Sequence, residues 1–138
     1  MSKGVTYLNP PNAPPPSGMY SHVARATAGE LAFIAGQVAV DGNGNIVGKG
    51  DFAEQVRQVF ENIGAVLKDL GTDFESVVQF TTYVTDAQHV PVWISTRNEI
   101  YPRLYPGGKY PPNTFVVVQA LVRPEFLVEI QTIAKVPG

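Results

Sequence analysis

Residues 111–134 read PPNTFVVVQALVRPEFLVEIQTIA, and this stretch predicts two long strands joined by a turn at Arg123-Pro124. β-Branched and aromatic side chains crowd residues 114–122, while residues 126–133 alternate in polarity. Both patterns are typical of strands in a sheet with a covered face. Glu129 interrupts the apolar residues of the second strand. Its carboxylate is therefore either solvated on an outward face, or buried and held by partners for a functional reason.

The composition limits what kind of protein this is. The chain has 138 residues, of which 44% are hydrophobic, so residues 1–138 are predicted to form one folded domain. Residues 1–18 contribute a short strand candidate, residues 5–8, followed by a proline-rich loop. This loop is expected to be a stiff connector, with a docking motif as the alternative.

Charge and cysteine content argue against several classes of partner. The formal net charge is -2 and no run of Lys or Arg occurs, so no groove for nucleic acid is expected. Cysteine is absent, which fits a reducing cytoplasm. His22 and His89 lack the spacing of zinc ligands. No signal-peptide pattern or membrane-length apolar run is seen, and we expect a cytoplasmic protein without metal or cofactor.

A hairpin is predicted near the N-terminus, from residues 22–27 and 31–40 with a turn between them. Gly36 lies inside the second of these strands. It predicts either a β-bulge or the close approach of another group to the backbone. The glycine-rich residues 41–45 are expected to be a plain loop, because they lack the Gly-Lys-Ser/Thr ending of a phosphate-binding loop.

The clearest helix is predicted over residues 51–70, with Asp51 as N-cap and Gly71 just past the C-terminal end. Apolar residues recur on one face of this helix, and Gln55 is assigned to the opposite, solvated face with Arg57, Gln58, Glu61 and Lys68. A strand at residues 77–85 follows, so the strand, helix and strand are expected to form a parallel, right-handed crossover.

A second helix is predicted to begin near Pro91, since proline is tolerated in a first turn. Pro102 should end this helix near Tyr101 or kink its last turn. The residues expected to face the sheet are Trp93, Ile94, Ile100 and Leu104.

The predicted order of elements implies an α+β domain, a mixed β-sheet with two helices on one face. The other sheet face also carries apolar side chains and has no helix to cover it. Such a face is expected to be buried against another copy of the chain.

Five stretches carry motifs in a fixed order. They are GMYS at 18–21, LAFIAGQ at 31–37, QVRQVFENIGAVL at 55–67, RNEIY at 97–101, and the two strands of residues 111–134. Together they resemble the RidA family, also called YjgF/YER057c/UK114. The resemblance implies a chorismate-mutase-like fold and a homotrimer whose sheets line a central barrel, with sites in clefts between subunits. It also implies a small-molecule substrate, an enamine or imine that is deaminated to a 2-keto acid and ammonia.

The resemblance also assigns site residues. Glu129 matches the catalytic glutamate, and the substrate-binding positions are Tyr20, Gly36, Gln37, Asn98 and Asn113. Each of the polar ones has a structural alternative, in packing, capping or bridging the backbone. In the family, an arginine at the place of Asn113 holds the substrate carboxylate through a bidentate pair. Asparagine carries no charge, and Ala35 stands where the family has serine.

The missing arginine leaves the function open between classes. One hypothesis is a hydrolase or deaminase with a non-standard substrate, and the other is a trimer that binds a small metabolite without turning it over. Endoribonuclease activity is a weaker alternative because the chain lacks a basic patch. Hydrolysis of imines that carry a carboxylate is predicted to be poor unless another cation replaces the arginine. The candidates are Arg25, Arg97, Arg103, Lys109 and Arg123, of which Lys109 and Arg103 lie nearest to Asn113 in sequence.

Overall fold

The structure is a computed structural model that describes residues 3–137. Its elements are, in chain order, β1 (Val5–Leu8), β2 (Val23–Ala26), β3 (Leu31–Gln37), α1 (Phe52–Asp69), β4 (Val77–Val84), α2 (Val90–Leu104), β5 (Asn113–Val117) and β6 (Val128–Lys135). Single 3₁₀ turns, Phe74–Ser76 and Ala87–His89, precede β4 and α2.

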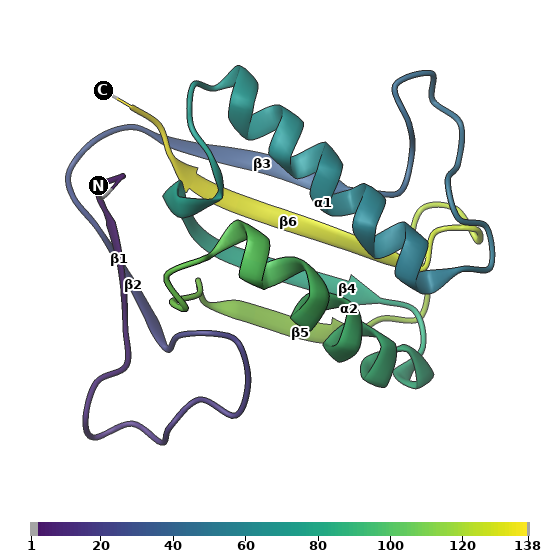
Figure 1. Cartoon of the computed structure of the whole chain (residues 1–138). Helices are drawn as coiled ribbons and strands as arrows, with labels where there is room; N and C mark the ends of the chain where they lie inside the picture. The colour runs from purple at the N-terminus through teal and green to yellow at the C-terminus, as the bar shows by residue number, and fades with distance from the viewer. Residues whose placement is uncertain (1–2, 138) are drawn as a thin grey trace.

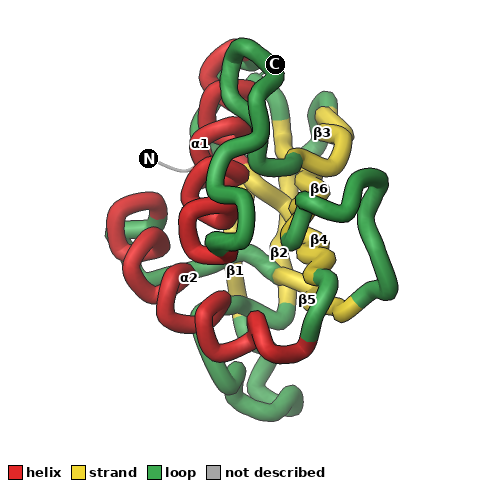
Figure 2. Tube along the Cα trace, turned by 90° about the vertical axis from the view of Figure 1, so that its right-hand side faces the viewer, coloured by secondary structure: helices red, strands yellow, loops and turns green. Residues whose placement is uncertain are grey.

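Four strands form a mixed sheet in the order β3-β6-β4-β5 (Figure 1). β6 is antiparallel to both β3 and β4, and β4 is parallel to β5. β3 and β4 therefore run in the same direction, as the crossover prediction required, with β6 inserted between them. α1 and α2 lie side by side on one face of the sheet (Figure 2), which confirms the two-layer α+β architecture.

The two strands predicted in residues 111–134 exist, but they are not neighbours and the first is shorter than expected. β5 ends at Val117 instead of continuing to Val122. Its partner β4 ends at Val84, whose carbonyl accepts the last bond from Val118 N at 2.8 Å. Beyond that point the chain has no strand to pair with, and Val122 is 84% exposed in the loop that leads to β6.

The predicted hairpin between β2 and β3 is wrong. β2 pairs antiparallel with β1 in a separate two-stranded sheet, and β3 pairs with β6. Alternating polarity identifies a strand but not its partner, and β1 supplies a partner that the pattern could not rank. The β1–β2 pair lies at the end of the main sheet where β4 begins (Figure 1), and the Tyr7 hydroxyl donates to the carbonyl of Val77 at 2.7 Å.

α1 begins and ends where its sequence signals predicted. Asp51 accepts a bond from Glu54 N at 3.0 Å, the N-cap contact. At the other end Gly71 has φ +79°, and Gly71 N and Thr72 N donate back to the last turn. This is a Schellman arrangement, which favours glycine at that position.

Gln55 was predicted to be solvated, and the structure places it in the core with 0% exposure. Its Nε2 donates to the carbonyls of Gly48 and Glu125, at 3.0 and 2.9 Å, and its Oε1 accepts from Leu127 N at 2.9 Å. The loop that enters β6 crosses over this part of α1, so a polar side chain is needed there. Helical periodicity alone cannot show such a loop crossing.

α2 begins at Val90 with Pro91 in its first turn, as predicted, and passes through Pro102 to end at Leu104. Of the two outcomes predicted for Pro102, an end near Tyr101 is therefore ruled out, because the helix continues to Leu104. Trp93 and Ile100 are buried against the sheet, but Ile94 is exposed and its prediction as a sheet-facing residue is wrong. The helix exposes this side near the edge strand β5, where no further strand covers it.

The sheet face opposite the helices carries large apolar side chains. Phe33 on β3 is 70% exposed, and Leu31 on the same strand is also exposed. This is the uncovered apolar face that the predicted topology implied. Among residues 3–137, no helix is long and apolar enough to cross a membrane.

Candidate functional site

The predicted site residues fall into two groups in one chain. The first group lies in a cavity of about 210 Å³ between α2, β5 and the loop before β2, here called the α2 pocket. Three polar side chains line it, those of Tyr20, Arg97 and Asn113. Its remaining walls are apolar and come from Met19, Val90, Trp93, Ile94 and Phe115.

Asn113 is the first residue of β5, and its side chain faces the helices because it is paired in register with Phe80 of the core. Its Oδ1 accepts a bond from the buried Thr82 hydroxyl at 2.9 Å. This bond fixes the orientation of the amide. It leaves the two N–H donors of Asn113 available to the α2 pocket.

Tyr20 belongs to the loop between the proline-rich segment and β2. Its hydroxyl oxygen accepts from Ser17 N at 3.4 Å, so its own proton remains available to a ligand. The ring also packs edge-on against His22 at 5.6 Å. His22 N in turn donates to the Asn9 side chain at 2.8 Å, which ties this loop to the end of β1.

Arg97 projects from α2 into the α2 pocket. Its Nε and Nη2 donate to Oδ1 of Asn98, at 3.4 and 3.2 Å. Partial burial lowers the pKa of the Arg97 guanidinium from its usual value, although an arginine remains charged in a protein. Within residues 3–137, no carboxylate lies within ion-pair distance of it.

Asn98 was predicted to bind the substrate. The structure places it on the exposed side of α2, outside the α2 pocket, where it accepts the two bonds from Arg97. In one chain, Asn98 therefore orients Arg97 and does not face the cavity itself.

The second group of predicted residues lies on the opposite face of the sheet. Glu129 follows the buried Val128 on β6 and is paired with Tyr83, so its side chain leaves the sheet on the uncovered face. It lies over the backbone of Gly36. A Cβ atom added to Gly36 would come within 2.1 Å of Glu129 Oε2. Gln37, the next residue of β3, donates through its side chain to the carbonyl of Ala35 at 3.1 Å.

Both of the structural roles predicted for Gly36 are present. The pairing of β3 with β6 shifts between Ile34 and Gln37, which is a β-bulge. The Glu129 carboxylate also occupies the space that a side chain at residue 36 would need. The glycine therefore permits the glutamate to lie flat against the edge of the sheet.

The predicted site is thus not assembled within one chain. Asn113 and Tyr20 lie on the helix side of the sheet, and Glu129, Gly36 and Gln37 lie on the uncovered side or at its edge.

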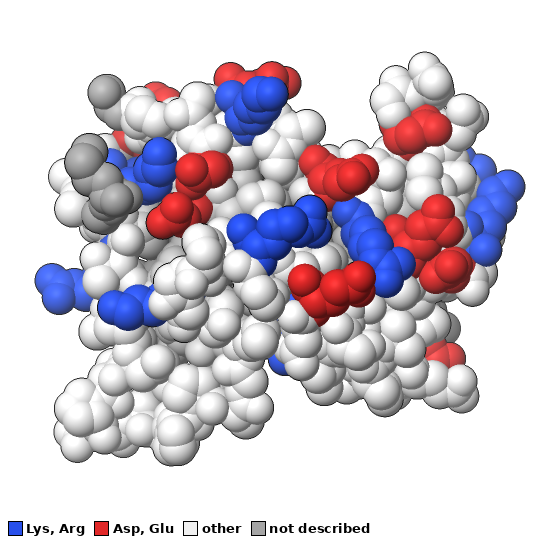
Figure 3. All heavy atoms as spheres, in the orientation of Figure 1, with Lys and Arg blue, Asp and Glu red and all other residues white. Residues whose placement is uncertain are grey.

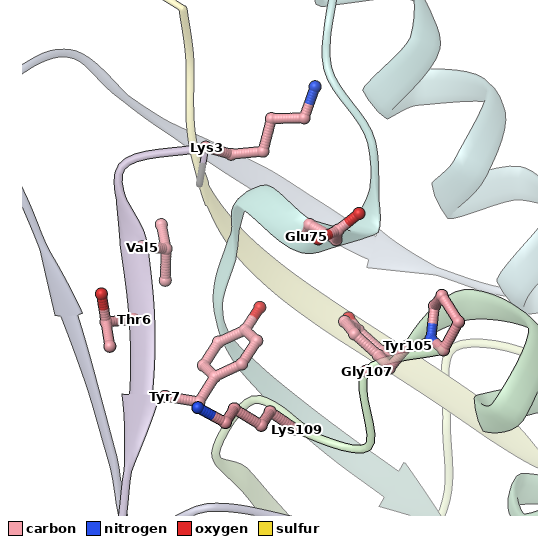
Figure 4. Close-up of a pocket in the computed structure, with 9 residues that line it drawn as sticks. Lys3, Val5, Thr6, Tyr7, Glu75, Tyr105, Gly107 and Lys109 are labelled. Carbon is pink, nitrogen blue, oxygen red and sulfur yellow. The ribbon is translucent and has the colours of Figure 1, made fainter. Parts of the chain in front are cut away.

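Among the candidate cations, Arg97 is the one that lines the α2 pocket together with Asn113. Lys109, nearest in sequence, lies instead beside Tyr7, in a cavity of about 270 Å³ that Tyr105 also lines (Figure 4). It also borders a hollow beside Tyr20, which does not include Asn113. The spacing of Trp93 and Arg97, four residues apart on one helix, is the sequence signal that could have identified Arg97.

The other candidate cations are elsewhere. Arg103 lines a hollow against α1 with Arg57 and Glu61, and Arg25 belongs to β2, where it is paired with Thr6 of β1. Arg123 pairs with Glu125 at 3.4 Å.

The surface shows no stripe of positive charge on the face drawn in Figure 3, where basic and acidic side chains are interleaved. Some of these neighbouring side chains form ion pairs, for example Arg57 with Glu99 at 3.1 Å. In the part of the chain described, no three His, Asp or Glu side chains come together to hold a metal ion.

Comparisons with known proteins agree with this fold. The family model described as Endoribonuclease L-PSP matches residues 10–136. A RutC family protein of Pyrococcus horikoshii is 37% identical over 123 residues, which cover 89% of this chain and 91% of that protein.

Solved structures agree as well. The Rid family protein YyfB from Yersinia pestis, a protein of unknown function, superposes with a TM-score of 0.85 at 34% identity and covers 96% of this chain and 99% of its own. RidA from an Antarctic Psychrobacter superposes with a TM-score of 0.64 at 30% identity, over 90% of this chain and 94% of its own. The chain therefore belongs to the RidA (YjgF/YER057c/UK114) family, as its five ordered motifs predicted.

Proposed function

We propose that this chain hydrolyses a small imine or enamine in clefts between the subunits of a homotrimer. The observation that carries this proposal is the separation of the site residues into two groups on opposite faces of the sheet. Neither group forms a complete site. The α2 pocket can bind and orient a ligand but is lined by no carboxylate or imidazole, and the Glu129 carboxylate does not line that pocket.

An assembly would bring the two groups together. The face that carries Glu129 also carries the exposed Phe33 and Leu31. A second copy that covers these apolar side chains places its own residues next to Glu129. A cleft that combines the α2 pocket of one subunit with Glu129 of its neighbour then contains donors, apolar walls and a carboxylate.

In this cleft Glu129 acts as a general base and then as a general acid. It takes a proton from water as the water oxygen attacks the C=N carbon, and it passes this proton to the nitrogen to give a carbinolamine. It then takes the remaining hydroxyl proton and passes that to the nitrogen as well. The C–N bond breaks, the water oxygen becomes the carbonyl oxygen, and the nitrogen leaves as ammonia. An enamine enters the same route once a proton has been added to its carbon. The balance needs water alone.

Two other functions are separated from this one by experiment. A trimer that binds a metabolite without catalysis would use the same α2 pocket but would show no turnover, with or without Glu129. Endoribonuclease activity, which the description of the matching family names, receives no support from the net charge of -2 or from the interleaved charges of Figure 3.

In the test, an amino-acid oxidase generates an imine. Semicarbazide, which traps the imine, competes with the protein for it. The native protein should lower the amount of trapped product in proportion to its concentration. Glu129→Gln keeps the shape of the side chain and removes its basicity, and it should lower this rate by about 100-fold or more. Equal rates with native protein and Glu129→Gln would refute the role of Glu129, and no rate above background would favour the non-catalytic alternative.

A further inference from the structure

We propose that Arg97 is the anion-binding residue of the α2 pocket and that it selects a small carboxylate, in place of an arginine at residue 113. This inference rests on the proposed function for the identity of the substrate, but the geometry that supports it belongs to this pocket alone.

The first support is the state of the guanidinium. Arg97 lines the cavity, is half-buried, and has no carboxylate within ion-pair distance among residues 3–137. A partly desolvated charge without a counter-ion is costly, and an anionic ligand removes that cost. By contrast, Arg57 and Arg123 each have a glutamate partner.

The second support is the orientation of Arg97. Asn98 accepts bonds from Nε and Nη2, which holds the plane of the guanidinium. Gly18 packs against another side of the Arg97 guanidinium. A Cβ added at Gly18 would lie only 3.3 Å from Nη2, so the glycine provides the space that the guanidinium occupies. A guanidinium fixed in this way presents its remaining N–H groups to a planar anion with little further loss of entropy.

The third support is the set of donors around the same cavity. The Asn113 amide, oriented by Thr82, and the Tyr20 hydroxyl, which already accepts from Ser17, each have a proton to donate. One charge and two neutral donors face apolar walls that include Trp93. This combination fits a small monocarboxylate with a short apolar body, and a volume of about 210 Å³ excludes a large ligand such as a nucleic acid.

A fluorescence titration tests the inference directly. Trp93 is the one tryptophan of the chain and forms a wall of the α2 pocket, so its emission reports on that pocket. The probe is pyruvate, and the neutral control is pyruvamide, which has the same shape without the charge. The variants are Arg97→Gln, the matched controls Arg103→Gln on the same helix and Lys109→Gln, and the double variant Arg97→Gln/Asn113→Arg. Circular dichroism checks that each variant is folded.

We expect Arg97→Gln to weaken pyruvate binding by about 10- to 100-fold, since a charge-assisted pair is lost. Arg103→Gln and Lys109→Gln should change it by less than about twofold, because neither side chain lines this pocket. Pyruvamide should not distinguish native protein from Arg97→Gln. Asn113→Arg, added to Arg97→Gln, should restore pyruvate binding, because it returns a guanidinium to the same cavity.

Three results would overturn the inference. These are no response of Trp93 to pyruvate in the native protein, equal affinity in native protein and Arg97→Gln, or a loss with Lys109→Gln as large as that with Arg97→Gln. The trapping assay keeps this outcome separate from the proposed function. Imine turnover that does not need Arg97 would refute this inference alone, and Arg97-dependent pyruvate binding without turnover would refute only the catalytic proposal.

Discussion

The contact between Gly36 and Glu129 makes one prediction about activity and one about stability, and the second does not depend on the substrate. A Cβ at residue 36 would lie 2.1, 2.6 and 2.8 Å from Oε2, Cδ and Cγ of Glu129. All three distances are below van der Waals contact, so Gly36→Ala forces the whole side chain of Glu129 into another rotamer. We therefore expect loss of imine hydrolysis without loss of the fold.

The effect on stability follows from two opposing terms. Relief of the overlap should cost about 1–3 kcal/mol, as for other overpacked sites. Replacing a glycine whose φ is not positive should restrict the unfolded chain and return about 0.4–1 kcal/mol. The net change in the free energy of unfolding should be a loss of about 1 kcal/mol.

A double-mutant cycle isolates the contact, because Glu129→Ala removes the three atoms that the new Cβ would meet. In the Glu129→Ala background, Gly36→Ala should stabilise the protein by about 0.4–1 kcal/mol. Urea unfolding at one fixed protein concentration measures all four corners of the cycle. Gly42→Ala is the matched control, since a Cβ there meets nothing within 4 Å. A loss of the same size in both backgrounds would show that Glu129 does not occupy this position.

Four further predictions concern the fold and its assembly. Asp51→Ala should lower the free energy of unfolding by about 1 kcal/mol through loss of the N-cap bond, and a urea titration that shows no change would contradict it. Gln55→Leu should lower it by about 2–4 kcal/mol, because two part-buried carbonyls and one N–H lose their partner; Gln58→Leu on the same helix, which removes a single side-chain bond to Asn62, is the control. Phe33→Asp should lower the molar mass seen by light scattering, and an unchanged mass would remove the uncovered face from the interface. Burial raises the pKa of Tyr7, Tyr101 and Tyr105 above the ordinary 10.0. These tyrosines therefore ionise in the unfolded chain before they ionise in the folded protein, so the free energy of unfolding is full below about pH 10 and should fall as pH rises further. A urea midpoint that stays constant up to pH 12 would refute this.

Local chemistry accounts for what the sequence could predict of the fold. Asp51 and Gly71 identified both ends of α1, and Gly36 identified the bulge, because each of these residues has a narrow set of backbone roles. Pairing was harder to predict. The partner of β2 and the early end of β5 depend on which strand lies alongside, and that is a property of the whole sheet.

In the candidate site too, individual residues could be predicted from the sequence, but their arrangement in space could not. The motifs predicted Glu129, Tyr20 and Asn113 as site residues, but not that they lie on opposite faces of the sheet. That fact follows from the register of β4 with β5 and β6. Proximity in sequence to Asn113 favoured Lys109 and Arg103, whereas α2 carries Arg97 to the pocket from 16 positions away in the chain.

The central claim is that a complete site needs two subunits, and mixed assemblies test it most directly. Asn113→Trp fills the α2 pocket and Glu129→Ala removes the carboxylate, so each variant alone should be inactive. The two are denatured together, refolded as an equal mixture and assayed by imine trapping. In a random mixture of cyclic trimers, three-quarters of the trimers contain both kinds of subunit and one of their three interfaces is intact, so about a quarter of native activity should return. If the mixture stays as inactive as the separate variants while native protein refolds with full activity, the two residues serve one site within a chain and the account is contradicted.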